Sequence, residues 1–267
     1  MSEQLSFKLF KPKQHLSTMI QALWSISLSP NNPSPVTKWL HSDACSGLIF
    51  NLHSSNGSGI KLGQECFTRG VISLPISKKS QTITLLPGAK VVGIRFHPGV
   101  SAAVLGKIFA KARLLNLTDE HSIIPQPILK QLYQQQQKLN LITGQYGHIT
   151  CLYRWLSAYL DDVNQLPSSL NTALTLLKHV ERTQEISQNI PLSQRQIERQ
   201  FQQWLDMSPK HYQRILRVKR SLNSLKQSPQ LQLADLAINA GFSDQAHMTR
   251  EFKAIAQITP KKYANGL

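Results

Sequence analysis

A sixteen-residue stretch near the end of the chain repeats an earlier stretch at a constant offset of 51 residues. The sequence IERQFQQWLDMSPKHY begins at Ile197, and MTREFKAIAQITPKKY begins at Met248. The matched positions are Ile197 with Met248, Arg199 with Arg250, Phe201 with Phe252, Pro209 with Pro260, and Tyr212 with Tyr263. An ungapped repeat of this kind predicts one supersecondary unit used twice. The C-terminal part should therefore fold as a tandem.

The second copy is predicted to end a helix-turn-helix unit. The preceding helix has an apolar face at helical spacing, formed by Leu233, Leu236, Ala237 and Ala240. Gly241 suits a left-handed position at the end of that helix. Either Ser243 or Asp244 then caps the next helix. Two helices joined by a tight turn that contains glycine are typical of a helix-turn-helix.

The first copy carries a strong signal for a helix start. Ser193 and Gln196 have the spacing of a capping box, and Leu192 and Ile197 can form a hydrophobic staple around it. A helix is therefore expected to begin near Ser193.

On a helical wheel, both repeated helices separate into an apolar side and a long-armed polar side. The apolar sides are Ile197, Phe201, Trp204 and Leu205 in the first helix, and Met248, Phe252 and Ile255 in the second. The polar sides are Arg195, Arg199 and Gln202 with Glu198 on the flank, and Ala246, Arg250 and Lys253 with Gln245 and Thr249 on the flank. Arg, Gln and Thr contact base edges or phosphates. A solvated helix face is the alternative, but the repeated layout favours DNA.

One long helix is predicted between the two copies, from Ser208 to Ser228. Its inward residues are Tyr212, Ile215, Leu216, Leu222 and Leu225. Its basic residues are Lys210, Arg214, Arg217, Lys219, Arg220 and Lys226, with no acid among them. Two neighbouring major grooves lie about 34 Å apart on one face of DNA. A rigid connecting helix would fix the spacing of two reading helices.

The first hundred residues are predicted to be rich in β-structure. Short apolar runs at 47–52, 71–74, 83–86 and 91–96 alternate with turn-forming stretches at 28–35, 54–59 and 85–90. Helices are expected at 101–115, 125–140 and 148–163. The run YQQQQKLN in the second of these is interpreted as a solvated helix face, with a partner-binding face as the alternative. The polar stretch at 164–170 is the predicted domain boundary.

Charge and composition limit the possible partners and compartment. The 267-residue chain has a net charge of +16, which favours nucleic acid or an anionic surface. Residues 168–267 hold 14 Lys and Arg against 7 Asp and Glu, and residues 1–167 hold 16 against 7, so charge alone does not locate the site. No apolar run is long enough to cross a bilayer and no signal-peptide pattern opens the chain, so we expect a cytoplasmic protein without a membrane partner.

Local patterns of common catalytic and metal sites do not occur in the sequence. There is no Gly-x-Ser-x-Gly motif and no phosphate-binding glycine loop. Cys45, Cys66 and Cys151 are too far apart for a compact zinc site, and none has the Pro-Cys-His context of a DNA-repair methyltransferase. The histidines of the β-rich part, His15, His41, His53 and His97, show no metal-ligand spacing. We therefore expect no catalytic residues, no metal and no cofactor.

The two motifs LSQRQIERQFQQWLDMSPKHYQRILRVKRSLNSL and LADLAINAGFSDQAHMTREFKAIAQITPKKY resemble the AraC/XylS family of bacterial transcription regulators over about the last 100 residues. The resemblance implies two helix-turn-helix units joined by a linker helix, with recognition helices that start near Ser193 and Asp244. It implies DNA-facing positions at Gln194, Arg195, Glu198 and Arg199, and at Gln245, Ala246, Thr249 and Arg250. The N-terminal part loosely resembles the cupin-like regulatory domain of such proteins.

This chain departs from the family pattern in two places. The family has glycine three residues before the proline of each closing motif, whereas this chain has Asp206 and Gln257. A left-handed conformation at a residue other than glycine costs about 1 kcal/mol. The segment TQEISQNIPLS, with Ile186 and Ser187, fits the first packed helix poorly, so the upstream unit is expected to be the weaker reader.

The complete prediction is an α+β protein that binds DNA and regulates transcription. Residues 1–165 form a cupin-like regulatory or dimerisation domain with flanking helices, and residues 166–267 form an all-α tandem helix-turn-helix domain. The predicted phosphate contacts are Arg214, Arg217, Lys219, Arg220, Lys261 and Lys262. Double-stranded DNA is the predicted partner; a small-molecule effector, RNA polymerase and a second copy of the chain are left open. The alternatives are a cupin-type binding protein or enzyme with a helical interaction module, and a non-specific architectural DNA binder.

Overall fold

The computed structural model describes residues 5–52, 58–106, 115–117, 125–160, 166–178 and 190–266. The chain forms two compact units. The first consists of Met1–Trp39, Cys45–Ile76 and Thr82–Gln165. The second consists of Leu40–Ala44, Ser77–Gln81 and Leu166–Leu267. Two short segments of the N-terminal half therefore belong to the C-terminal unit.

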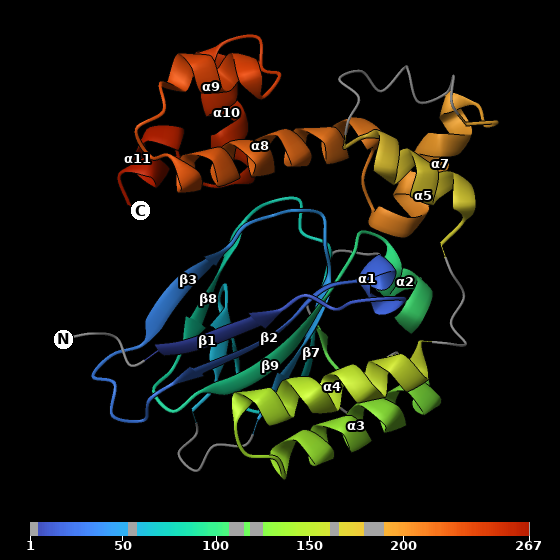
Figure 1. Cartoon of the computed structure of the whole chain (residues 1–267), viewed down its shortest axis with the longest axis vertical. Coiled ribbons are helices and arrows are strands. Elements are labelled where there is room, and N and C mark those ends of the chain that lie inside the picture. Colours follow the sequence, from blue (N-terminus) through green and yellow to red (C-terminus); the bar gives the residue numbers. More distant parts are fainter. Residues whose placement is uncertain are drawn as a thin grey trace. The chain divides into compact units, whose positions relative to one another are not determined.

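The first unit contains two antiparallel sheets, one of six strands and one of four (Figure 1). In spatial order, the larger sheet consists of β1 (Leu5–Phe10), β2 (Ile20–Leu28), β9 (Lys90–Phe96), β4 (Gly47–Asn51), β7 (Gly70–Leu74) and β10 (Leu115–Asn116). All five residues of β4 are buried, as expected for a strand covered on both faces. The smaller sheet consists of β3 (Val36–Leu40), β8 (Gln81–Leu85), β5 (Ile60–Leu62) and β6 (Glu65–Phe67). The amide of Asn51 donates to the carbonyl of Phe67 at 2.8 Å and so ties the two sheets together.

Four helices accompany the sheets in the described part of the first unit. Two are short, α1 (Leu16–Met19) and α2 (Val100–Leu105). The other two, α3 (Gln126–Asn140) and α4 (Gln145–Tyr159), pack against β7 and β2 and cover the six-stranded sheet (Figure 1). The ring of Trp155 on α4 meets Phe50 of β4 edge to face, with centroids 6.1 Å apart. The predicted β-rich part with flanking helices is confirmed, but the helix expected at 101–115 is not formed as a whole, because α2 ends at Leu105 and Leu115 belongs to β10.

The glutamine run on α3 is not the solvated face that its composition suggested. Gln135 and Gln136 are 2% and 4% exposed. The Gln136 amide donates to the carbonyl of Asn51 at 2.6 Å, and the Gln135 amide donates to the sulfur of Cys151 at 3.2 Å. The earlier interpretation was wrong for these two residues because helical periodicity places them beside Leu132 and Leu139, on the buried face.

The described part of the second unit is helical, apart from the two short segments. It contains α5 (Ser168–Leu176), α7 (Gln194–Leu205), α8 (Pro209–Gln227), α9 (Leu233–Asn239), α10 (Gln245–Ile255) and α11 (Pro260–Ala264). Figure 1 shows α7 near the beginning of α8 and the group α9 to α11 along its later part. The predicted long connecting helix is confirmed as α8, and its residues Tyr212, Ile215, Leu222 and Leu225 are buried as expected. Leu216 is half-buried.

Two predicted features fall outside the described residues. The segment that should hold the first packed helix of the upstream unit lies mostly within residues 179–189. His53 lies within residues 53–57. Across the ranges that are described, no helix is both long and apolar enough to span a membrane.

Candidate nucleic-acid interface

The downstream helix α10 begins and is oriented as the sequence predicted. The N–H of His247 donates to the Asp244 carboxylate at 2.6 Å, so Asp244, and not Ser243, is the helix cap. This bond is also the main reason that the pKa of Asp244 is lowered. The preceding helix α9 ends at Asn239, and Gly241, two residues further on, has a left-handed φ of 82°. The N–H groups of Gly241 and Phe242 bond back to the carbonyls of Ile238 and Ala237, which is the Schellman arrangement.

The two sides of α10 differ sharply in exposure. Met248, Phe252 and Ile255 are at most 1% exposed. The predicted DNA-facing residues Gln245, Ala246, Arg250 and Lys253 are exposed, and Thr249 is half-buried with its hydroxyl on the carbonyl of Gln245. The arrangement leaves a face that carries cationic and amide groups.

The upstream helix α7 has the same design. Ser193 accepts from the N–H of Gln196, and the Gln196 side chain accepts from the N–H of Ser193, so the capping box is confirmed. Ile197, Phe201 and Leu205 are at most 4% exposed. The predicted contacts of this helix are exposed; they are Gln194, Arg195, Glu198, Arg199 and Gln202.

Some polar side chains of α7 already bond to neighbours on their own helix. Gln194 donates to Glu198 at 3.1 Å, and Gln202 donates to Asp206 at 2.7 Å. Arg195 and Arg199 make no hydrogen bond or ion pair within the described ranges. Their guanidinium groups are therefore the cations of this face that are available to an outside anion.

The repeat extends to an unusual backbone feature. Asp206 and Gln257 are 51 residues apart, and their φ angles of 53° and 60° are both left-handed. These are the positions at which the family has glycine. The Gln257 amide bonds to the carbonyls of Lys253 and Ala254, and Asp206 accepts from Gln202 and Lys78. Side-chain bonds thus offset part of the conformational cost.

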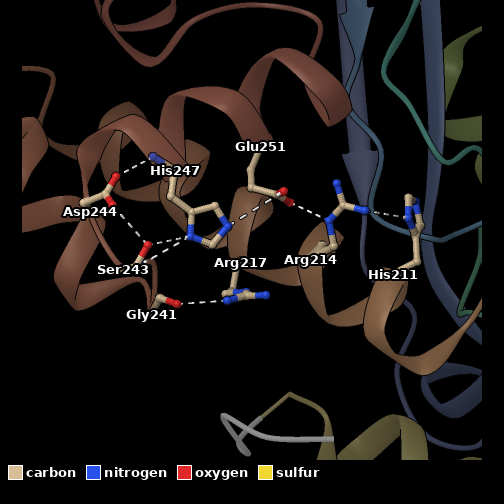
Figure 2. A network of polar contacts seen from close by, with 8 residues as sticks. All are labelled: His211, Arg214, Arg217, Gly241, Ser243, Asp244, His247 and Glu251. Atoms are coloured by element: carbon tan, nitrogen blue, oxygen red, sulfur yellow. Dashed lines mark hydrogen bonds and ion pairs between the residues drawn. The ribbon is translucent and has the colours of Figure 1, made fainter.

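A polar network fastens α10 to α8 (Figure 2). Nε of Arg214 donates to Glu251 at 2.6 Å, and the second oxygen of Glu251 lies 3.9 Å from Nε2 of His247. The other ring nitrogen of His247, Nδ1, lies 3.0 Å from the hydroxyl oxygen of Ser243. The Glu251 side chain is 12% exposed, so its charge requires the Arg214 partner. The network fixes how α10 presents its polar face.

Arg217 provides a second link between α8 and the turn of the downstream unit. Its Nη1 atom donates to the carbonyl of Gly241 at 2.9 Å (Figure 2), and its guanidinium lies 5.6 Å from the ring centre of Phe242. Burial lowers the pKa of Arg217, but the group stays a cation at any physiological pH. Arg217 therefore fixes the turn at Gly241 and Phe242 against α8.

The predicted phosphate contacts separate into two groups. Arg214, Arg217 and Lys219 are half-buried and bond to Glu251, to Gly241 and to Asp43 respectively. Arg220, Lys261 and Lys262 are exposed. Sequence reasoning missed Glu251 as the partner of Arg214. A signal was available, because Glu251 lies one helical turn from Met248 on the apolar side, where a carboxylate needs a cation.

The segments Leu40–Ala44 and Ser77–Gln81 contact several helices of the second unit. Lys78 pairs with Asp206 at the end of α7, and Asp43 pairs with Lys219 of α8, both at 3.1 Å. The N–H of Ser80 donates to the carbonyl of Ile255 at the end of α10 at 2.7 Å. Side-chain and backbone bonds between Ser42, Ser77 and Ser80 join the two segments to each other. No sequence signal pointed to these contacts.

The histidines considered as metal ligands have other surroundings. His41 stacks edge to face on Tyr263, and His97 bonds to the carbonyl of Ser17. Leaving aside the stretches that are not described, no group of three or more His, Cys, Asp or Glu side chains is placed to hold a metal ion.

The helices α7 and α10 are both capped, and each has a buried apolar side and an exposed polar side. They occupy matching positions in the repeat, and the long helix α8 lies between them in the chain. With α9 and α10 joined by the turn at Gly241, this arrangement defines the C-terminal unit as a helix-turn-helix domain. Residues 186–266 match the protein family described as a helix-turn-helix domain, and residues 8–122 match a domain of unknown function, DUF6597.

Two curated relatives match the C-terminal region. The HTH-type transcriptional regulator ArgR of Pseudomonas aeruginosa is 31% identical over 83 residues, which are 31% of this chain and 25% of that protein. An uncharacterised HTH-type transcriptional regulator of Haemophilus influenzae is 33% identical over 101 residues, which are 35% of this chain and 33% of that protein. The chain thus spans a quarter to a third of the length of these relatives.

Two of the solved structures that resemble this chain are as follows. ToxT of Vibrio cholerae aligns with 88% of this chain and 99% of its own, at 12% identity and a TM-score of 0.47. An AraC-type regulator of Chromobacterium violaceum aligns with 36% of this chain and 89% of its own, at 28% identity and a TM-score of 0.35. The resemblance to AraC/XylS regulators that the two motifs predicted is therefore confirmed for the C-terminal region.

Proposed function

We propose that this chain is a sequence-specific DNA-binding transcription regulator that inserts α7 and α10 into two adjacent major grooves. The observation that carries the proposal is the exposed polar side of each helix. Arg195 and Arg199 on α7, and Arg250 and Lys253 on α10, are exposed long cationic side chains next to Gln and Thr residues. Arginine forms bidentate bonds to guanine, and glutamine to adenine, in the major groove.

The length of α8 supports two-groove binding. Its 19 residues, at 1.5 Å each, give a helix about 28 Å long. Successive major grooves on one face of DNA are about 34 Å apart. A stiff connector of nearly this length, which packs against both α7 and α10, supports such a spacing.

Within the proposal, the basic residues have two different jobs. Arg220, Lys261 and Lys262 neutralise phosphates, because they are exposed. Arg214, Arg217 and Lys219 act mainly inside the protein and orient the reading helices, because their charged ends are engaged. The predicted phosphate role is therefore proposed for the exposed group first.

The first unit modulates DNA binding in this proposal. The chain itself supports the idea, since Leu40–Ala44 begins with the last residue of β3 and Ser77–Gln81 ends with the first residue of β8, yet both segments pack in the second unit. A change in strand position would pass along the backbone to the contacts with Asp206, Lys219 and Ile255.

Selection of bound sequences from a random DNA pool with the full chain tests the proposal. We expect one enriched motif with two half-sites about one helical turn apart. Affinity for that motif should exceed affinity for a scrambled duplex by about 10³-fold or more at physiological salt. The log–log salt slope should be about −0.9 per phosphate contacted.

Two results would contradict the proposal. Equal affinity for selected and scrambled DNA would favour a non-specific architectural binder. Affinity that does not change with salt would exclude DNA as the partner of this surface. The Lys61→Ala variant, which changes an exposed lysine of the first unit, serves as the matched control for loss of a single charge.

A further inference from the structure

Strand β1 forms one edge of the six-stranded sheet, and most of its residues are exposed. In the described part of the chain, β2 is the one strand that pairs with it. In an antiparallel pair, every second residue of an edge strand points its N–H and C=O groups away from the partner strand. Such groups can bond to another extended chain. The strand LSFKLF therefore offers main-chain donors and acceptors along its outer side.

The two faces of β1 carry different side chains. Phe7 and Leu9 are 53% and 50% exposed and lie on one face, because alternate residues of a strand share a face. Lys8 lies on the opposite face with Ser6 and Phe10, which contact Gln145 and Tyr146 of helix α4. Large apolar side chains exposed on an edge strand indicate a surface for pairing with another chain.

A hollow of about 360 Å³ lies at the end of β1, between residues 11–13 and helix α4. Leu23 of β2 and Ile149 of α4 line it and are 1% and 7% exposed. Tyr146 and Tyr153 of α4 also line it, and they lie on the same stripe of the helix as Ile149 because their spacing is helical. The hollow has room for a large apolar side chain.

The surface around β1 and the hollow is basic. Lys8, Lys11 and Lys13 are exposed, and residues 5–19 and helix α4 contain no acid. A second copy of β1 at this edge would bring like charges together, which disfavours self-pairing. A lipid surface would leave the outward main-chain groups of β1 without partners. An extended chain that carries carboxylates suits both the main-chain groups and the lysines.

We propose that β1 binds an extended segment of another protein in which apolar and acidic residues alternate. The segment adds to the outer side of β1 through main-chain hydrogen bonds, which is the β-augmentation mode of peptide recognition. Its apolar side chains pack against Phe7 and Leu9 on one face. On the other face one carboxylate lies beside Lys8, one apolar side chain enters the hollow, and a second carboxylate lies beside Lys11 or Lys13. This binding does not rest on the proposed function, because β1 and α4 belong to the first unit.

The test uses the full chain and the peptide Val-Glu-Val-Leu-Val-Glu-Val-amide with a fluorophore at its N-terminus. The order of its side chains is the same in both directions, so it suits a parallel or an antiparallel addition. We expect saturable binding in fluorescence anisotropy and slower hydrogen exchange of the β1 amides in the complex. Lys8→Glu should weaken binding about tenfold or more. Lys61→Glu reverses the charge of an exposed lysine in the other sheet and should leave binding unchanged.

Changes to the peptide test each part of the surface without altering the protein. N-methylation of the four valines removes the N–H groups along one edge of the peptide, and N-methylation of the other three residues removes those along the other edge. We expect one of these peptides to lose binding and the other to keep it, because a peptide strand faces β1 with one edge. Replacing Leu by Ala in the peptide should weaken binding about tenfold, since less apolar surface is buried. Replacing both Glu by Lys should abolish binding.

The proposal is overturned if the peptide does not bind saturably, if both N-methylated peptides bind like the parent peptide, or if Lys8→Glu binds as tightly as the parent chain. Thermal unfolding of the lysine variants separates lost binding from lost folding. Binding to phosphatidylglycerol vesicles that Phe7→Ser abolishes, without peptide binding, would assign this face to a membrane instead. A dimer in sedimentation that Phe7→Ser dissociates, without peptide binding, would assign it to a second copy of the chain.

Discussion

Nε of Arg214 and Oε2 of Glu251 lie 2.6 Å apart and join the connecting helix α8 to the reading helix α10. The Glu251 carboxylate lies on the buried side of α10 and the Arg214 guanidinium is one-third exposed. Burying two charges costs hydration free energy, which offsets much of their attraction. The pair therefore fixes the orientation of α10 on α8 more than it stabilises the fold. In the proposed function, it sets the angle at which α10 enters the major groove.

Removing one partner of this pair should destabilise the second unit. Arg214→Ala leaves the Glu251 charge largely buried and unpaired, so we expect the free energy of unfolding to fall by about 1–3 kcal/mol. Urea unfolding measures the change. Arg220→Ala removes an exposed arginine of the same helix and should change stability by less than about 0.5 kcal/mol. Equal losses for the two variants would mean that the pair is not structural.

Arg250 should read sequence rather than neutralise a phosphate. Arg250→Ala is expected to cost about 1–3 kcal/mol on the selected DNA and to relax the preference at one base position. Lys262→Ala should weaken binding to all sequences alike and make the log–log salt slope shallower by about one. Fluorescence anisotropy at several salt concentrations separates the two patterns. A uniform loss for Arg250→Ala would make it a phosphate contact.

The left-handed residues provide a stability test. Gln257→Gly should raise the free energy of unfolding by about 0.5–1 kcal/mol, because glycine adopts positive φ without strain. Asp206→Gly should gain less, since it also removes the bonds to Lys78 and Gln202. Urea midpoints of both variants decide the order. A loss of stability in Gln257→Gly would show that its bonds to Lys253 and Ala254 outweigh the strain.

His211 should make stability depend on pH. Its pKa is lowered, chiefly by burial and then by the Arg214 charge. The unfolded chain therefore takes up a proton near the ordinary value of 6.5 before the folded chain does, so the free energy of unfolding falls as pH drops below about 6.5. His211→Gln should flatten this dependence in urea unfolding between pH 7 and pH 5. Burial also lowers the pKa of His41 and of His148, so both should contribute in the same direction to the slope that remains.

Local signals predicted the helical unit well. The capping box at Ser193, the left-handed Gly241 and the buried side of Met248, Phe252 and Ile255 depend on residues within a few positions of each other. The short strands between turn-forming stretches were predicted for the same reason.

Contacts between distant residues were not predictable from local patterns. Arg214 and Glu251 are 37 residues apart, and Lys219 and Asp43 are 176 apart. A single sequence does not indicate which cation pairs with which acid. Its basic residues therefore predict phosphate contacts at Arg214, Arg217 and Lys219, although all three have partners inside the protein. The burial of Gln135 and Gln136 could not be predicted for the same reason. A glutamine side chain is buried only where other parts of the chain supply its hydrogen-bond partners, here Cys151 and Asn51.

The segments Leu40–Ala44 and Ser77–Gln81 bear on how this protein can be divided and recombined. An expression fragment that starts at residue 166 would leave Lys219, Asp206 and the carbonyl of Ile255 without the partners supplied by Asp43, Lys78 and Ser80. A chimaera that joins these helices to another sensor domain would lack the same three contacts. Modular exchange in this protein therefore requires replacing three contacts as well as choosing a junction.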